Sequence, residues 1–122
     1  MHREGNEEKM SNFECVICIV NHGFTDLVMT AAKKAGARGG TVLSARGTGN
    51  KEVEEFFGVT VTPEKDVVLI LVPQDIRDNV LTLVNAEAGM STKGMGIAFS
   101  VPVSDTVGIV GNEKENNAEE GK

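Results

Sequence analysis

Residues 66–72 read Asp-Val-Val-Leu-Ile-Leu-Val, and this apolar run predicts a buried strand in the middle of a sheet. Residues 73–75, Pro-Gln-Asp, follow it and begin a pattern in which apolar residues recur at helical spacing as far as Gly89. We expect Asp75 to cap this helix and Asp78 to lie in its first turn. The expected buried face of the helix consists of Ile76, Val80, Leu83, Val84 and Ala88.

The amino-terminal half of the chain shows the same strand–helix–strand pattern. Residues 13–20 are rich in β-branched side chains and are bounded by polar residues, which predicts a strand. A helix is expected next, with Gly36 directly after its last turn, and a second strand is expected over 40–46. The apolar residues of this first helix are Phe24, Leu27, Val28, Ala31, Ala32 and Ala35.

A fourth strand is expected over 97–103, and residues 104–110 are expected to add a short edge strand. The resulting order β-α-β-β-α-β is that of a ferredoxin-like α+β sandwich, a four-stranded antiparallel sheet with both helices on one face. The sheet has more apolar side chains than one helix-covered face can bury, which predicts oligomerisation through the sheet. The apolar side chains in question are Ile17, Ile19, Leu69, Leu71, Val101 and Val103.

Composition excludes several classes of function. The net charge of −6 disfavours nucleic acid as a partner, and the chain has no Trp or Tyr to stack on bases. No apolar run approaches the roughly 18 residues of a membrane span, so we expect no direct membrane insertion. The amino terminus has no apolar core of a signal peptide, so a cytoplasmic location is expected. We expect residues 1–11 to be a disordered segment, 12–110 the folded domain and 111–122 a disordered acidic tail.

Two residue types that often carry chemistry are expected to be inactive here. Cys15 and Cys18 form a C-x-x-C motif, but residues three apart on a strand point to opposite faces. The two sulfurs should therefore share neither a metal ion nor a disulfide, and we expect two inert, half-buried thiols. His22 lies in the turn after the first strand, where we expect it to be exposed and without a role.

Two glycine-rich stretches remain: residues 46–49, Arg-Gly-Thr-Gly, and residues 89–96, Gly-Met-Ser-Thr-Lys-Gly-Met-Gly. Such loops offer backbone N–H groups, hydroxyls and a lysine, which can hold an anion or a nucleotide. Nothing beside them resembles a nucleophile, an acid–base pair or a metal cluster, so the sequence favours a sensor over an enzyme. The simpler alternative for residues 89–96 is a flexible turn. The connection 47–65 is long for a compact domain and is interpreted either as a short helical turn or as a docking arm.

Several of these segments together resemble the PII nitrogen-regulatory signal proteins. They are residues 39–42, Gly-Gly-Thr-Val, leading to 46–49; Lys65 before the third strand; residues 94–99, Gly-Met-Gly-Ile-Ala-Phe; and residues 101–103, Val-Pro-Val. The pieces occur in the family's order, and the similarity covers about residues 12–110.

The resemblance implies a homotrimer with clefts between its subunits that bind an adenine nucleotide (ATP, ADP or AMP). It also implies a long loop, here 47–65, that docks on a partner protein such as a membrane transporter or an enzyme. Backbone N–H groups of the second glycine loop, with the hydroxyls of Ser91 and Thr92, would supply most of the polar contacts. The ligand-binding residues that it implies are Gly39, Thr41, Arg46, Gly47, Thr48, Gly49, Lys65, Ser91, Thr92, Lys93, Gly94, Met95 and Gly96.

The chain also departs from the family's pattern. A lysine of the family's phosphate loop is replaced by Ile97, two arginines fall on Gly108 and Val110, and the modified tyrosine is missing. Lys93 and Arg46 are the candidates to replace these cations. The alternatives are a small trimeric metal-handling or enzymatic protein of related fold, and a scaffold that has lost ligand binding.

Overall fold

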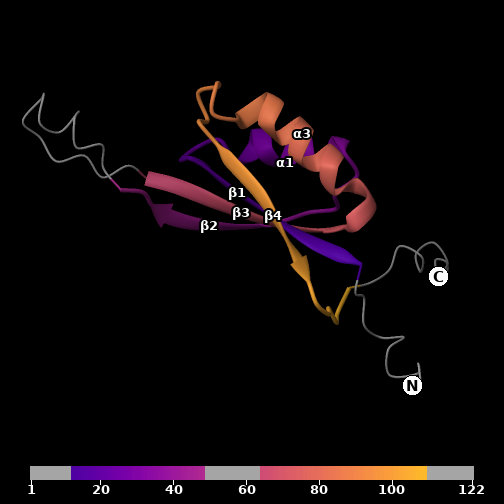
Figure 1. The fold of residues 1–122 in the computed structure, drawn as a ribbon. Helices are drawn as coiled ribbons and strands as arrows, with labels where there is room; N and C mark the ends of the chain where they lie inside the picture. Colours follow the sequence, from indigo (N-terminus) through magenta and orange to yellow (C-terminus); the bar gives the residue numbers. More distant parts are fainter. Residues whose placement is uncertain (1–11, 49–63, 110–122) are drawn as a thin grey trace, which may run out of the picture.

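The computed structural model describes residues 12–48 and 64–109 of the chain, shown in colour in Figure 1. The elements follow the predicted order β-α-β-β-α-β. They are β1 (Phe13–Asn21), α1 (Thr25–Lys34), β2 (Thr41–Arg46), β3 (Glu64–Pro73), the short 3-10 helix η2 (Gln74–Ile76), α3 (Arg77–Ala88) and β4 (Ile97–Val103). The expectations for residues 1–11 and 111–122, and for most of the connection 47–65, lie outside the described residues.

The four strands form one antiparallel sheet in the order β2-β3-β1-β4. Strand β3, which contains the apolar run 66–72, therefore lies in the middle of the sheet beside β1. Both helices pack on the same face of the sheet (Figure 1). This arrangement confirms the ferredoxin-like sandwich. Neither helix of the described ranges is long and apolar enough to cross a membrane.

The core lies between the helices and one face of the sheet. Along β1 and β3 every second residue is buried, as expected when one face of a strand is covered and the other is open. The largest fully buried side chains are Val16, Val20, Val28, Val68, Ile70, Val72 and Val80. Helix α1 contributes mainly small residues, Ala31 and Ala32, to the core, whereas Leu27, one of its apolar residues, is exposed.

Gly36 ends helix α1 as predicted. It has a positive φ of 112°, which a residue without a Cβ adopts at little cost. Its N–H donates to the carbonyl oxygen of Lys33 at 3.0 Å, and the Ala37 N–H donates to that of Ala32 at 2.9 Å. This pair of hydrogen bonds is a Schellman motif, which satisfies two carbonyl groups at the helix end.

The start of helix α3 differs from the expectation. The chain first forms the 3-10 turn η2, so Asp75 lies inside this turn, and the N-cap position falls on Ile76, which has no side-chain cap. Arg77 instead pairs with two carboxylates: Asp78 in the first turn, at 3.0 Å, and the buried Glu14 of β1, at 3.3 Å. The second ion pair supplies the partner that a buried carboxylate needs.

Two further expectations are corrected. Residues 104–109 form no strand, so β4 is an edge of the sheet as far as the structure describes it. Cys15 and Cys18 do point to opposite faces, but Cys18 is fully buried rather than half-buried, and burial raises the pKa of its thiol to about 11.

The sheet face away from the helices is apolar and uncovered in the single chain. We call it the open face. The register places residues of all four strands beside one another on it, for example Leu43 beside Val67, and Ile17 between Leu69 and Phe99. The exposed members include Leu43, Leu71, Ile97, Phe99 and Val101, at 38–54% exposure. The apolar excess predicted from the sequence is therefore confirmed, and it is concentrated on one surface.

Candidate functional site

The candidate site lies at one edge of the sheet, where β1 ends and β3 begins. Asn21 is the last residue of β1 and pairs with Lys65 of β3, which in turn pairs with Ala45 near the end of β2. On the other side of β1, Ile97 begins β4 and is preceded by the loop 89–96. Antiparallel pairing thus brings together two segments that lie far apart in the sequence, the start of β3 and the loop after α3.

Loop 89–96 is held in a tight conformation by its own hydrogen bonds. The hydroxyl of Thr92 donates to the Gly89 carbonyl at 2.7 Å and accepts from the Gly94 N–H at 3.1 Å. The N–H groups of Thr92 and Met95 donate to the carbonyls of Gly89 and Thr92, and the Gly96 N–H donates to Ala88 at 2.8 Å. Met95 has a positive φ of 47°, which is uncommon for a residue with a side chain.

These bonds revise how the loop can hold a ligand. The N–H groups of Thr92, Gly94, Met95 and Gly96 all have acceptors within the chain, so they are not the ready donors that the sequence suggested. The hydroxyl of Thr92 is also engaged. We therefore expect side chains, above all lysines, to carry more of an anion's binding than the backbone does.

Lys65 is the cation at the centre of this edge. Its ammonium Nζ donates to the Asn21 Oδ1 at 2.8 Å. Its aliphatic stem lies under Gly47, where an added Cβ would meet the Lys65 Cε at 3.2 Å. The amide Nδ2 of Asn21 donates to the Lys93 carbonyl at 3.0 Å, and the Asn21 N–H donates to the Gly94 carbonyl at 2.9 Å. Two side chains, those of Lys65 and Asn21, thus connect the start of β3 with the end of β2 and with loop 89–96.

One chain brings together only part of the predicted set. Lys65, Gly47 and the loop 89–96 share the edge. Arg46 lies at the same edge opposite Glu64, but strand alternation places it on the helix-covered face, whereas Lys65 is on the open face. Thr41 pairs with Leu69, four residues along β3 from Lys65, which is roughly 13 Å at strand spacing. The remaining predicted residues are Gly39, which lies before β2, Thr48, which is exposed and follows Gly47, and Gly49, which lies outside the described residues.

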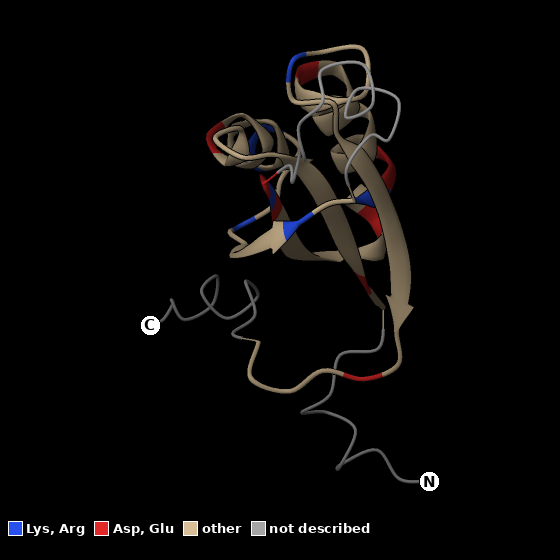
Figure 2. Ribbon diagram, turned by 90° about the vertical axis from the view of Figure 1, so that its left-hand side faces the viewer, with Lys and Arg blue, Asp and Glu red and all other residues tan. Residues whose placement is uncertain are grey.

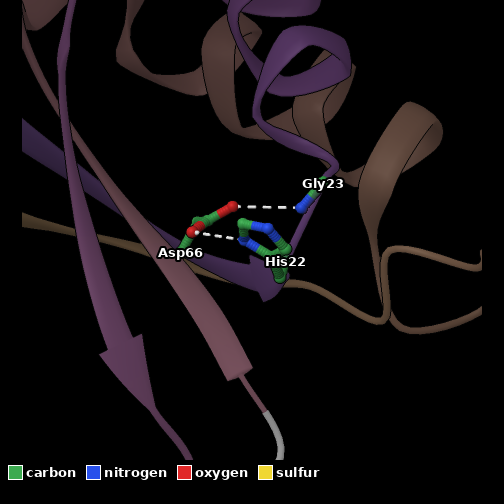
Figure 3. Close-up of polar contacts among 3 residues, drawn as sticks. All are labelled: His22, Gly23 and Asp66. Atoms are coloured by element: carbon green, nitrogen blue, oxygen red, sulfur yellow. Dashed lines mark hydrogen bonds and ion pairs between the residues drawn. The ribbon is translucent and has the colours of Figure 1, made fainter.

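His22 has a contact that the sequence did not suggest (Figure 3). Its side chain is 66% exposed, but its Nδ1 lies 3.2 Å from the Oδ1 of the buried Asp66. The Gly23 N–H donates to the Oδ2 of Asp66 at 3.1 Å, and it holds the pKa of this carboxyl below its usual value. Burial opposes this shift, and His22 adds to it. Asp66 belongs to the helix-covered face and Lys65 to the open face, so this pair is separate from the candidate site.

The described part of this edge carries charges of both signs, Arg46, Lys65 and Lys93 with Glu64 and Asp66. Charged side chains are absent from β4, the strand on the right-hand side of Figure 2, which is tan along its whole length. Ile97, where the family's lysine was expected, is 54% exposed, and Gly108 has a φ of 90° that suits glycine rather than arginine. Among residues 12–48 and 64–109, no three His, Cys, Asp or Glu side chains are grouped so that they could hold a metal ion. The arrangement suits binding of a moderately charged anion.

Comparison with solved structures supports this description of the fold. The structure of PII from Arabidopsis thaliana, bound to citrate, is 29% identical, with a TM-score of 0.63; the match covers 81% of this chain and 84% of that one. A DUF3240 family protein from Shewanella baltica matches with a TM-score of 0.61 at 12% identity, over 83% of this chain and all of that one. The second match shows similarity of fold alone.

A comparison with curated proteins found no match. The family model described as nitrogen regulatory protein P-II matches residues 13–113, which is most of the chain and includes every described strand and helix. With the β-α-β-β-α-β sandwich and the likeness to the Arabidopsis structure, this match shows that the chain belongs to the nitrogen regulatory protein P-II family.

Proposed function

We propose that this chain is a non-enzymatic PII-like signalling protein of the cytoplasm. It senses a small anionic or nucleotide ligand at clefts between the subunits of a homotrimer, and it regulates a partner protein, a transporter or an enzyme, through residues 47–65. The observation that carries the proposal is the open face, an apolar surface that ends at the polar edge formed by Lys65 and loop 89–96.

The open face is the reason to propose assembly. Large contiguous apolar surfaces are uncommon on monomers and usually mark an interface. Here residues from every strand contribute, and three of the exposed ones, Ile97, Phe99 and Val101, alternate along the edge strand β4. Further copies of the same chain are the occupant that the family match favours, because the resemblance to P-II proteins implies a homotrimer.

Assembly would also complete the ligand site. Thr41 lies roughly 13 Å along the sheet from the edge with Lys65. A nucleotide that contacts both Thr41 and loop 89–96 is therefore easier to accommodate between two chains than within one. We propose that Gly39 and Thr41 of one subunit line the base and ribose, while Lys65, Lys93 and Ser91 face the phosphates.

The charge of the site favours a ligand with fewer phosphates. With the family's lysine replaced by Ile97 and an arginine by Gly108, the cations proposed to contact the phosphates are Lys65, Lys93 and Arg46. A triphosphate depends on charge-assisted hydrogen bonds, each worth about 1.5–3 kcal/mol. We therefore expect ATP to bind more weakly than in typical P-II proteins, and AMP or ADP to bind at least as well as ATP.

Two leucines of nearly equal exposure test the assembly. Leu71 on the open face is 38% exposed and Leu27 on α1 is 40% exposed. If the chain were a monomer, Leu71→Glu and Leu27→Glu would have similar small effects. We expect only Leu71→Glu to convert the trimer to monomers in sedimentation velocity, because it places a charge in an apolar interface. A monomeric wild-type chain would refute the assembly.

Calorimetry with ATP, ADP and AMP tests the ligand. Lys65→Ala and Lys93→Ala should each weaken binding by about 1–3 kcal/mol, the effect of losing a hydrogen bond to a charged group. Lys33→Ala, at an exposed lysine in the last turn of α1, is the matched control and should bind as the wild type does. Unchanged affinity in both site variants would move the site elsewhere, and no heat from any nucleotide would favour a different effector or a scaffold.

A further inference from the structure

Asn21 is a polar residue in an apolar row. The β1 residues on the open face are Phe13, Cys15, Ile17 and Ile19, and Asn21 continues the same alternation at the end of the strand. It is half-buried and directly opposite Lys65. A half-buried carboxamide beside an ammonium requires partners for its polar atoms, because an unsatisfied polar group is costly.

Those partners come from two different parts of the chain. The carboxamide oxygen of Asn21 accepts from the Lys65 ammonium at 2.8 Å, and its amide nitrogen donates to the Lys93 carbonyl at 3.0 Å. The backbone N–H of Asn21 adds a bond to the Gly94 carbonyl at 2.9 Å. One side chain therefore bridges the start of β3 and the loop 89–96, using both ends of its carboxamide.

We propose that Asn21 is a positioning residue that fixes the Lys65 ammonium and the Lys93–Gly94 turn relative to each other, so that the anion site is preorganised before a ligand arrives. The inference rests on the proposed function for its ligand, but the positioning itself is a property of the free protein. A lysine side chain loses considerable rotamer freedom when it is held, and a pre-existing hydrogen bond reduces that cost at the moment of binding.

The bridge predicts an effect that Lys65 alone would not produce. Among the described residues, Lys65 has no hydrogen bond of its own to loop 89–96. If Asn21 links Lys65 to loop 89–96, Lys65→Ala should nevertheless loosen the loop, because the Asn21 carboxamide loses the hydrogen bond that orients it. If Asn21 only occupies the last position of the strand and does not link the two, the Lys65→Ala substitution should leave the hydrogen exchange of the loop unchanged.

Amide hydrogen exchange on the full chain without ligand tests this. In Lys65→Ala we expect the Gly94 and Met95 amides to exchange about two- to tenfold faster, the factor that corresponds to one net hydrogen bond. Lys33→Ala, the matched control on α1, should leave them unchanged. In an Asn21→Ala background, Lys65→Ala should add no further acceleration, because residues that act through one contact are non-additive.

Asn21→Asp separates the two bonds and does not depend on whether the alanine variant folds. It keeps an acceptor for Lys65 and removes the donor to the Lys93 carbonyl, so we expect fast exchange in the loop although Lys65 remains paired. Unchanged loop exchange in both Lys65→Ala and Asn21→Asp would overturn the proposal.

ADP affinity adds a readout that a purely structural role would not move. Asn21→Ala should weaken ADP binding about threefold or more in the wild-type background and have little effect in Lys65→Ala. Equal weakening in both backgrounds would overturn the positioning role. If the wild type binds no nucleotide, the proposed function fails, while the exchange measurements still decide the role of Asn21.

Discussion

Gly96 is where loop 89–96 packs most closely against the body, and replacing it with alanine should have a large cost. A Cβ at this position would overlap the Ala88 carbonyl oxygen and lie 2.7 Å from the Cγ1 of Val20. Val20 is fully buried and Ala88 ends helix α3, so neither can easily move. Forcing an extra methyl group into a packed site costs about 1–3 kcal/mol. For a domain of this size, each kcal/mol lowers the melting temperature by roughly 4–8 °C.

The matched control for this substitution is Gly39→Ala. Nothing lies within 4 Å of the Cβ that would be added at Gly39, and its φ is outside the positive range. Here the loss of unfolded-state entropy should leave stability unchanged or raise it by up to about 1 kcal/mol. Thermal unfolding followed by circular dichroism compares the two variants. Equal melting temperatures for Gly96→Ala and Gly39→Ala would refute the close packing of the loop.

Two further predictions concern acid stability and thiol reactivity. The pKa of Asp66 is lowered in the folded state, so the ionised carboxylate stabilises the fold. This stabilisation is fully present above the unfolded pKa of about 3.8 and is lost as the pH falls through the lower pKa of the folded state. Asp66→Asn should therefore lower the melting temperature at pH 6. In this variant the melting temperature should also fall less steeply between about pH 5 and 2 than in the wild type. A fall as steep as in the wild type would contradict the pairing of Asp66 with Gly23 and His22. Cys18, with a pKa raised to about 11, should resist alkylation at pH 8 in the folded protein, as mass spectrometry can measure. Rapid folded-state modification at Cys18, rather than at the half-buried Cys15, would show that the sheet opens easily.

Much of the fold could be predicted because its signals are local. The apolar run 66–72 and the glycine at Gly36 depend on near neighbours, and both appear in the structure as expected, with β3 longer than predicted by two residues at its start and one at its end. The predictions that were wrong concern segments whose sequence is compatible with more than one local structure. Asp75 has the chemistry of an N-cap, but the chain forms a 3-10 turn there. Residues 104–109 include Thr106, Val107 and Ile109, whose side chains suit a strand, but none of the described strands pairs with them.

The candidate site was harder to predict because it depends on register. The loop 89–96 was singled out by its glycine-rich sequence and Lys65 by the resemblance, but Asn21 was not singled out. A polar residue at the end of an alternating strand is unremarkable until the pairing places it opposite Lys65 and beside Lys93. The internal hydrogen bonds of the loop were equally hidden, because Thr92 could as well have faced a ligand as its own backbone.

Native mass spectrometry of the full chain with ADP measures assembly and ligand number together, and it therefore tests whether the chain is a trimeric nucleotide sensor. We expect an assembly of three chains, each of 13.0 kDa, that binds as many as three ADP molecules. We expect the Leu71→Glu variant to appear as monomers without bound ADP. A wild-type monomer, or a trimer that binds no ADP, AMP or ATP at any concentration in the measurable range, would refute the proposed function.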